Sequence, residues 1–436
     1  MDDPILIAVI GVIAMFMLIA AHAPVGAAMG IAGVLTFAAL AGFGPGVAAL
    51  GAEAITAVTS LDFAIIPLFL LMGGFAVAGG LSTDLYKLAH AVLGHRRGGL
   101  AMATIGVCAL FGAICGSAIA TVATMTRVAL PEMLAKNYKP SFAAGSIVAG
   151  GALGVIIPPS LILVIYAVLT ELPVLTLFAA AVVPGIIATL FQLAAAVIHA
   201  RLHPDEAPPA PRDDWPARRK ALTGSWAVVA LGVIVTGGIY GGVFTVTEAA
   251  SVGAAGAFLM YLVRGRLSRE SLTDVARDTA RNAGVIYVIV IGAFAMTYFL
   301  AVSGLSAAIV GGIQSLNLPP IAVILAFYVM YLALGAVFES LAVLVVTLPF
   351  VMPVVIGLGY DPVWWGVMLV MISGVGMITP PIGINVFVLH GMMEDISLGE
   401  IFRGVAPFFI ADIARVLVLT FIPGLVTWLP KLMGLM

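Results

Sequence analysis

Residues 154–166 read GVIIPPSLILVIY, an apolar run with two adjacent prolines near its middle. Proline has no backbone N–H, and its ring clashes with the carbonyl four residues earlier, which costs about 3 kcal/mol or more inside a helix. The apolar run extends over roughly one membrane span. The sequence therefore predicts a membrane helix that is broken at Pro158 and Pro159.

The composition of the whole chain is that of a membrane protein. Of 436 residues, 62% are hydrophobic and 9% are charged, whereas a soluble domain carries roughly 25% charged residues. Apolar runs long enough to span a bilayer recur along the chain, which predicts an all-α polytopic membrane protein without a separate soluble domain. The segment 5–21 follows an acidic start, so we expect a retained first span rather than a signal peptide. The expected surroundings are the lipid bilayer, and no nucleic acid partner is expected.

Basic residues gather in alternate gaps between the apolar segments. By the positive-inside rule these gaps are cytoplasmic and the gaps without Lys or Arg face outward, which predicts a periplasmic N-terminus. The outward gaps are 44–62, 170–173, 241–248, 303–320 and 357–362.

The expected elements follow from the apolar segments. Block 98–135 starts and ends on the basic side, so it is either two full spans or a re-entrant hairpin. Its Gly116-Ser117 turn favours a hairpin whose tip stops inside the membrane. Spans are expected near 4–22, 25–43, 63–81, 140–169, 174–200, 224–242, 246–263, 283–302, 363–390 and 405–430, with amphipathic pieces at 83–94 and 268–281, a linker at 203–220 and a second apolar block at 319–353.

The two halves of the chain contain an internal repeat. Gly112 and Gly116-Ser117 precede Pro131 and the first Pro-Pro pair, just as Gly335 and Glu339-Ser340 precede Pro353 and Pro380-Pro381. Gly154 stands four residues before the first pair, as Gly376 does before the second. The charge pattern gives the two halves opposite orientations. Inverted repeats with matched broken segments predict a secondary transporter with a site near the bilayer midplane.

Broken membrane helices expose carbonyl oxygens that hydrocarbon cannot satisfy. Sodium prefers hard oxygen ligands such as carbonyls and hydroxyls, and helix N-termini favour an anionic substrate. Groups suited to this chemistry lie at both tips and both breaks: Ser117, Gly154, Ser160, Ser340, Gly376, Thr379 and Asn385.

Several other polar residues have a simpler interpretation. Asp412 and Arg415 lie one helical turn apart and are expected to neutralise each other. Arg127 either extends toward the cytoplasm, which is favoured, or faces the cavity and meets a carboxylate. Glu339 is the acid most worth testing for ion coupling. Cys108 and Cys115 are expected to be small buried side chains rather than a disulfide, and the cluster of His390, Glu394 and Asp395 is expected to be a solvated helix end rather than a metal site.

The sequence resembles the large membrane subunit of tripartite ATP-independent periplasmic (TRAP) transporters over essentially its whole length. The resemblance rests on four stretches, which read IPLFLLMGGFAVAGGLS, GHRRGGLAMATIGVCALFGAICGSAIATVATMTRVALPEM, GALGVIIPPSLILVIY and GMITPPIGINVFV. It implies an elevator-type, inverted-repeat transporter with two re-entrant hairpins and two Pro-Pro-broken helices. It also implies a separate small four-span subunit and a soluble periplasmic binding protein that delivers the substrate.

The family's sodium-binding positions fall on residues of both halves. The substrate-binding candidates are Ser160, Thr121, Asn385 and Arg127. The sodium positions implied by the resemblance are Ser117, Gly154 and Pro158 in the first half, and Gly335, Ser340, Gly376, Thr379 and Pro380 in the second. Family members often have a second Ser and an Asp at the first tip, where this chain has Ala118 and Thr121.

The expected domains follow the same resemblance. They are scaffold spans and a cytoplasmic arm in 1–97; a transport-domain part with the first hairpin and broken helix in 98–200; a linker in 201–222; scaffold spans and a second arm in 223–302, with the transport domain beginning near 283; and a second transport-domain part in 303–436.

These features together predict sodium-coupled uptake of a small organic anion, most simply a carboxylate, across the bacterial inner membrane. No organic cofactor and no metal besides sodium is expected. A stand-alone sodium/carboxylate symporter is the main alternative, and a channel is another. An intramembrane enzyme would need a charged catalytic pair near the breaks, and the sequence has none there.

Overall fold

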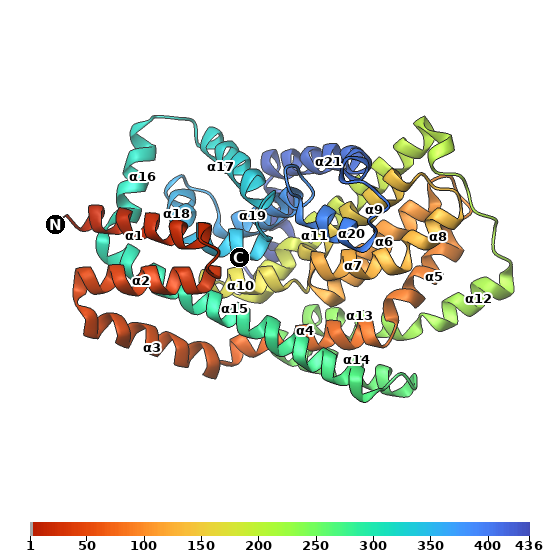
Figure 1. Ribbon diagram of the computed structural model, residues 1–436, viewed down its shortest axis with the longest axis horizontal. Helices are drawn as coiled ribbons and strands as arrows, with labels where there is room; N and C mark the ends of the chain where they lie inside the picture. The colour runs from red at the N-terminus through yellow and green to blue at the C-terminus, as the bar shows by residue number, and fades with distance from the viewer. Residues whose placement is uncertain (1–2) are drawn as a thin grey trace.

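The computed structural model describes residues 3–436, and every regular element within that range is a helix (Figure 1). The first half contains α1 (Pro4–Ala20), α2 (Val25–Ala41), α3 (Phe43–Thr59), α4 (Leu61–Ala78), α5 (Leu81–Leu93), α6 (Gly99–Cys115), α7 (Ala118–Val128), α8 (Leu130–Ala135), α9 (Pro140–Ala152), the 3-10 turn η1 (Leu153–Val155), α10 (Leu161–Leu169) and α11 (Val174–Leu202).

A short connection leads into the second half. The connection contains η2 (Pro204–Glu206) and α12 (Trp215–Gly224). The second half contains α13 (Trp226–Tyr240), α14 (Val246–Val263), α15 (Arg269–Ser303), α16 (Leu305–Ser315), α17 (Pro320–Gly335), α18 (Ser340–Gly357), α19 (Pro362–Gly376), α20 (Ile384–Met392), α21 (Leu398–Phe421) and α22 (Gly424–Leu432).

The helices confirm a polytopic membrane protein. In the range 3–436, seven helices are long and apolar enough to cross a bilayer by length and composition, and shorter apolar helices pack among them. Three of the shorter apolar helices, α6, α17 and α19, end at or just before glycines, namely Gly116, Gly335 and Gly376.

Two helix pairs connect the halves through small residues. α2 packs along α15, and α4 packs along α14, as Figure 1 shows for the long helix α15 beside α2. A Cβ at Gly33 would lie 2.7 Å from the carbonyl carbon of Ala295, and one at Gly26 would lie 2.6 Å from the Cα of Ile289. Only glycine allows the two backbones to approach this closely, which is a common way of packing membrane helices.

Both predicted hairpins are present. α6 ends at Gly116, whose φ of +66° suits a residue without a Cβ, and Ser117 then begins α7. In the second half, the chain turns between α17 and α18 at residues 336–339. The block 98–135 therefore folds back at the predicted Gly116-Ser117 turn.

Both predicted broken helices are also present. α9 continues through η1 and stops, and α10 begins after Ser160. α19 stops at Gly376, and α20 begins at Ile384. The Pro158–Pro159 and Pro380–Pro381 peptide bonds are both cis. α9 and α19 are buried along almost their whole length and form the centre of the core.

Two expected loops are helices. The outward gap at 44–62 contains α3, and the gap at 303–320 contains α16. The absence of Lys and Arg predicted on which side of the membrane these segments lie, but it did not indicate whether they are helical. The first is rich in alanine, and its one proline, Pro45, lies in the first turn, where proline is tolerated.

Three predicted boundaries are wrong. The segments 268–281 and 283–302 form one continuous helix, α15, because no proline separates them and the single Gly284 is tolerated. The last span divides at Pro423 into α21 and α22. The second part of the expected linker is helical, because Asp214 caps α12 by accepting a hydrogen bond from the backbone N–H of Ala217.

The expected ion pair in the last long helix is confirmed. Arg415 Nε lies 2.7 Å from Asp412 Oδ1, and both side chains are buried. The amide of Gln192 on α11 donates to both oxygens of Asp412 and to the carbonyl of Ala149 on α9. The pair therefore joins three helices of the core. Cys108 and Cys115 are free thiols, as expected.

Candidate functional site

The first hairpin tip is an ordered helix start. Ser117 is the N-cap of α7, and its Oγ accepts a hydrogen bond from the N–H of Ala120 at 3.3 Å. Thr121 Oγ1 donates to the carbonyl of Ser117 at 2.7 Å. Two candidate residues thus hold one turn of backbone at the tip.

This tip lies directly against the first broken helix. A Cβ at Gly112 would overlap the Cα of Gly154. A Cβ at Gly154 would lie 3.1 Å from Thr121 Oγ1 and 3.4 Å from the carbonyl oxygen of Ser117. Glycine at both positions lets the tip and the break approach at backbone distance, so oxygens from both elements can reach one ion.

The first break leaves carbonyl groups unpaired. Ser160 Oγ donates to the carbonyl of Val155 and caps α10 by accepting from the N–H of Leu163. Among residues 3–436, no donor reaches the carbonyls of residues 156–159. Pro158, Pro159 and Ser160 are buried, so these carbonyls need a ligand or water.

The second tip and break repeat the glycine arrangement. A Cβ at Gly376 would lie 2.7 Å from the Cα of Gly335, and one at Gly335 would lie 3.1 Å from the Cα of Gly376. Gly383 then donates from its N–H to the carbonyl of Ala336 in the tip, at 2.9 Å. Ser340 Oγ contacts Met377 Sδ at 3.0 Å. The two halves therefore build the same close contact from different residues.

Asn385 is the most unusual polar side chain of the second break. Its backbone N–H donates to the carbonyl of Met377 at 3.1 Å. Its side chain is fully buried, and neither its Nδ2 nor its Oδ1 has a hydrogen-bond partner within the described residues. Thr379 Oγ1, by contrast, donates to the carbonyl of Val375 at 2.7 Å. A buried amide without partners is costly unless a ligand or water meets it.

The two tips face one cavity of about 320 Å³. Its walls come from both hairpin tips, from both breaks and from α4 and α15. The residues that line it are Leu70, Gly116, Ser117, Ala118, Ile119, Ala120, Val155, Leu161, Ile162, Asn282, Val285, Ile286, Ile289, Glu339, Ser340, Leu341, Ala342 and Met377.

The charge of this cavity comes from one residue. Glu339, exposed on the second tip, is the one charged side chain among the described residues that line it, and Asn282 of α15 adds an amide. The first turns of α7 and α18 also face the cavity, so two helix N-termini present backbone N–H groups and partial positive charge to it. The cavity therefore combines one carboxylate and one amide with the N-termini of two helices.

The structure brings most of the predicted residues together. Ser117 and Ser340 line the cavity. Gly154 and Thr121 lie directly behind the first tip, Gly335 and Gly376 lie behind the second, and Pro158, Ser160, Thr379, Pro380 and Asn385 belong to the breaks. Arg127 differs. It is exposed in the last turn of α7 and does not line the cavity, so the geometry agrees with the favoured prediction that its side chain extends away from the cavity.

Asn282 is the polar cavity residue that the sequence did not single out. It lies where an amphipathic helix was expected to give way to a separate span. Its only sequence signal is an uncharged polar residue between Arg281 and the following apolar run. The continuous course of α15 is what places this position beside the tips.

Inverted repeats, two hairpin tips and two broken helices around a shared cavity define a secondary membrane transporter. Residues 12–425 match the family described as "Tripartite ATP-independent periplasmic transporter, DctM component". The chain belongs to this family and is a large permease subunit of the TRAP type, a multi-pass protein of the inner membrane.

Individual relatives agree with this assignment. The chain is 34% identical to the C4-dicarboxylate TRAP transporter large permease protein DctM of Pseudomonas aeruginosa, over 85% of this chain and 86% of that protein. It is 32% identical to the isethionate TRAP transporter permease protein DctMQ of Oleidesulfovibrio alaskensis, over 95% of this chain and 65% of that protein.

A solved structure shares the fold. The YdaH transporter of Alcanivorax borkumensis superposes with a TM-score of 0.58, covering 85% of this chain and 88% of that chain, at 15% sequence identity. At this level of identity the similarity concerns the fold alone.

Proposed function

We propose that this permease couples the inward movement of sodium ions to the uptake of a small organic anion, most simply a carboxylate. The observation that carries the proposal is the cavity between Ser117 and Ser340, with unpaired carbonyl oxygens behind one tip and an unpartnered amide behind the other. The names of two relatives, for C4-dicarboxylates and isethionate, agree with an anionic substrate.

Each tip and the break behind it would form one sodium site. Sodium prefers carbonyl and hydroxyl oxygens, which the first tip and break supply through the backbone near Gly154 and Pro158 and through Ser117. Thr121, predicted from the sequence as a substrate-binding candidate, is assigned here to the sodium site because its Oγ1 lies beside Gly154. The second site would use the backbone of Gly335, Gly376 and Pro380, together with Ser340, Thr379 and Asn385. The close glycine contacts support both sites, because they bring two backbones within reach of one ion.

Glu339 gives a physical reason for coupling. Glu339 is the only charged residue among the described residues that line the cavity, so an entering carboxylate substrate meets like charge. Two helix N-termini offset part of this repulsion, at roughly half an elementary charge each. Bound sodium ions supply the rest, so the anion binds well only after sodium, which is the requirement for symport.

The transport step would follow an elevator mechanism. The hairpins and broken helices, which include the deeply buried α9 and α19, would move as one body against the helices joined by the α2–α15 and α4–α14 contacts. Residues 283–302 are thereby assigned to the scaffold rather than to the transport domain, because they belong to the single helix α15 that contacts α2 through glycines. The N-terminus would be periplasmic, as the distribution of basic residues indicates.

The permease would act with two partners, a small four-span membrane subunit and a periplasmic binding protein. The DctMQ relative supports the first of these, because this chain spans only 65% of its length. The binding protein would select the anion and deliver it to the cavity between the tips.

Uptake in proteoliposomes tests the function. The permease is reconstituted with its small subunit, a substrate-loaded binding protein is added outside, and a sodium gradient is imposed. Accumulation that depends on this gradient is expected, and equal accumulation without it would refute sodium coupling. Uptake without the binding protein would instead identify a stand-alone symporter.

A further inference from the structure

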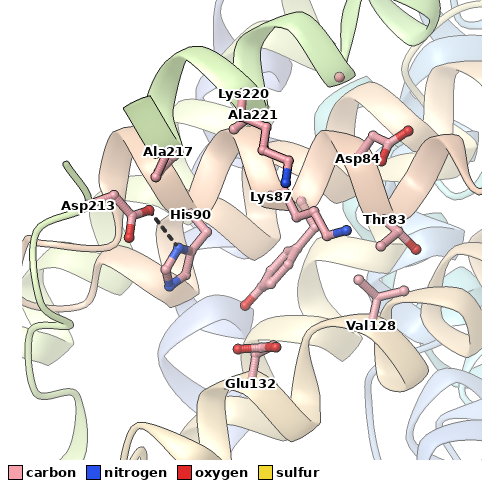
Figure 2. Close-up of a pocket in the computed structure, with 13 residues that line it drawn as sticks. Thr83, Asp84, Lys87, His90, Val128, Glu132, Asp213, Ala217, Lys220 and Ala221 are labelled. Carbon is pink, nitrogen blue, oxygen red and sulfur yellow. Dashed lines mark ion pairs between the residues drawn. The ribbon is translucent and has the colours of Figure 1, made fainter. Parts of the chain in front are cut away.

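A second, larger cavity of about 510 Å³ lies away from the tips (Figure 2). It is formed by α5, by the helical part of the linker, α12, and by the region where α7 meets α8. Figure 1 places α5 and α12 at the end of the molecule opposite the N-terminus. The residues that line it are Thr83, Asp84, Tyr86, Lys87, His90, Ala91, Val128, Glu132, Asp213, Ala217, Lys220, Ala221 and Gly224.

Two lysines from different helices converge in this cavity. Figure 2 shows Lys87 of α5 and Lys220 of α12 extending into the same space. Neither ammonium group forms a salt bridge with any residue in the described range 3–436. Both side chains are exposed, so water screens their mutual repulsion, and an anion between the two ammonium groups would be attracted by both charges.

The acidic residues of the cavity do not neutralise these lysines. Asp84 is paired with Arg264, and Asp213 lies 3.4 Å from His90 Nδ1. Glu132 stands on the opposite wall and forms no salt bridge within the described part of the chain. His90 Nε2 is buried and has no hydrogen-bond partner among residues 3–436. Two free ammonium groups and one unsatisfied ring nitrogen therefore face a single free carboxylate.

The surroundings of the cavity indicate a membrane–water boundary. α12 carries the exposed Trp215 and Leu222, and Trp226 is exposed at the start of α13. Tryptophan concentrates at the level of the lipid headgroups, and basic pockets beside membrane helices bind acidic lipid headgroups. The same short helix thus carries a charged residue that faces the cavity and apolar residues suited to the bilayer.

We propose that this cavity binds the phosphate group of an anionic phospholipid. The phosphate would lie between Lys87 and Lys220, with His90 Nε2 as a further donor when the imidazole is protonated. The acyl chains would leave past Leu222 and Trp226 into the bilayer. Since Val128 and Glu132 form the opposite wall, the lipid would join the arm helix α5 and the linker helix α12 to the base of the first hairpin.

Native mass spectrometry of the full chain in detergent tests this site. The probes are phosphatidylglycerol, phosphatidylethanolamine as the lipid without net charge, and inorganic phosphate. We expect tighter retention of phosphatidylglycerol than of phosphatidylethanolamine. Each lysine near a membrane surface contributes about fivefold to the affinity for an anionic lipid. The Lys87→Gln/Lys220→Gln double variant should therefore bind phosphatidylglycerol about 25-fold more weakly.

Matched variants separate a built site from general surface charge. Arg219→Gln removes one positive charge from the neighbouring position of α12, outside the cavity lining, and should leave binding unchanged. The Lys87→Arg/Lys220→Arg pair keeps both charges and should restore binding. Thermal unfolding of each variant checks that it folds.

Three outcomes would overturn the proposal. Unchanged retention of phosphatidylglycerol by the double Gln variant would show that the two lysines do not bind the lipid. An equal loss of phosphatidylglycerol retention in the Arg219→Gln variant would show that the effect depends only on the net charge of the protein. Displacement of the lipid by a large excess of inorganic phosphate would assign the site to a soluble anion instead. None of these measurements depends on transport activity.

Discussion

Gly112 on α6 and Gly154 in the first break lie so close that a Cβ at Gly112 would overlap the Cα of Gly154. Gly335 and Gly376 form the corresponding contact in the second half, with a Cβ of Gly376 only 2.7 Å from the Cα of Gly335. These two contacts place each hairpin tip against its broken helix.

Replacing Gly112 by alanine should therefore abolish uptake. The added methyl group separates the tip from the break, at a cost of about 1–3 kcal/mol for overpacking, and moves the ligands of the first site apart. Uptake in proteoliposomes and thermal unfolding measure the two effects. The matched control is Gly106→Ala on the same helix, where a Cβ meets nothing within 4 Å. Loss of uptake in both variants would show that the contact is not the cause.

Thr121 and Thr126 offer a matched test of the proposed first sodium site. Both lie on α7, both are buried, and each hydroxyl donates to the carbonyl four residues earlier, at 2.7 and 2.8 Å. Only Thr121 lies against Gly154. Thr121→Val should raise the sodium concentration for half-maximal uptake about tenfold, as expected for loss of one oxygen that contacts a charged group. Thr126→Val should leave it unchanged, and equal shifts in the two variants would exclude a specific role for Thr121.

Asn385 allows the second site to be tested without transport. Asn385→Leu replaces a buried, unpartnered amide with an apolar side chain, so it should stabilise the sodium-free protein by about 1–3 kcal/mol. Wild type should be stabilised by sodium, by about 2.7 kcal/mol at one hundred times the dissociation constant. The variant should show a smaller sodium effect, which thermal unfolding in sodium and in potassium measures. If sodium stabilised the variant as much as the wild type, Asn385 would not be a sodium ligand.

Glu339→Gln tests the electrostatic argument for coupling. Removing the only charged side chain of the described cavity lining lowers the repulsion of an anion and the attraction for cations. The dependence of uptake on sodium concentration should become less steep, and half-maximal uptake should require more sodium. Substrate binding in the absence of sodium should become detectable. Substrate binding is measured by scintillation proximity, and an unchanged sodium dependence would contradict the proposed role.

The buried network of Asp412, Arg415 and Gln192 should be structural. Arg415→Met alone leaves the Asp412 carboxylate buried without its partner and should destabilise the protein by about 3–5 kcal/mol. The double variant Asp412→Leu/Arg415→Met removes both charges and should restore most of that loss. Chemical unfolding measures the difference, and a double variant as unstable as the single one would assign the pair another role.

The features predicted best from sequence were those with a strong steric cause. The Pro-Pro pairs cannot lie inside a helix, and their matched positions predicted both breaks and, together with the residues that precede them, both hairpins. Glycines at corresponding places indicated the internal repeat, and the structure adds that they form two close backbone contacts. Ser117 and Ser340 were found because they occupy matched positions in the two halves.

The features predicted least well depended on packing between distant segments. α3 and α16 were missed because a segment without Lys or Arg can be a loop or a helix. Which of the two it forms depends on its packing against neighbouring segments. Asn282 and the course of α15 were missed because the change from a charged to an apolar pattern near residue 282 suggested a boundary, although no proline separates the two segments. The cavity of Lys87 and Lys220 joins segments more than 120 residues apart, and no local pattern connects them.

The continuity of α15 has a mechanical consequence. An α-helix of 35 residues is about 50 Å long, and α15 is fixed to α2 through glycine contacts while four of its residues line the cavity between the tips. One wall of that cavity is therefore a single unbroken rod. In the proposed elevator mechanism the two tips would slide along this rod, so α15 would act as a rail that guides both proposed sodium sites.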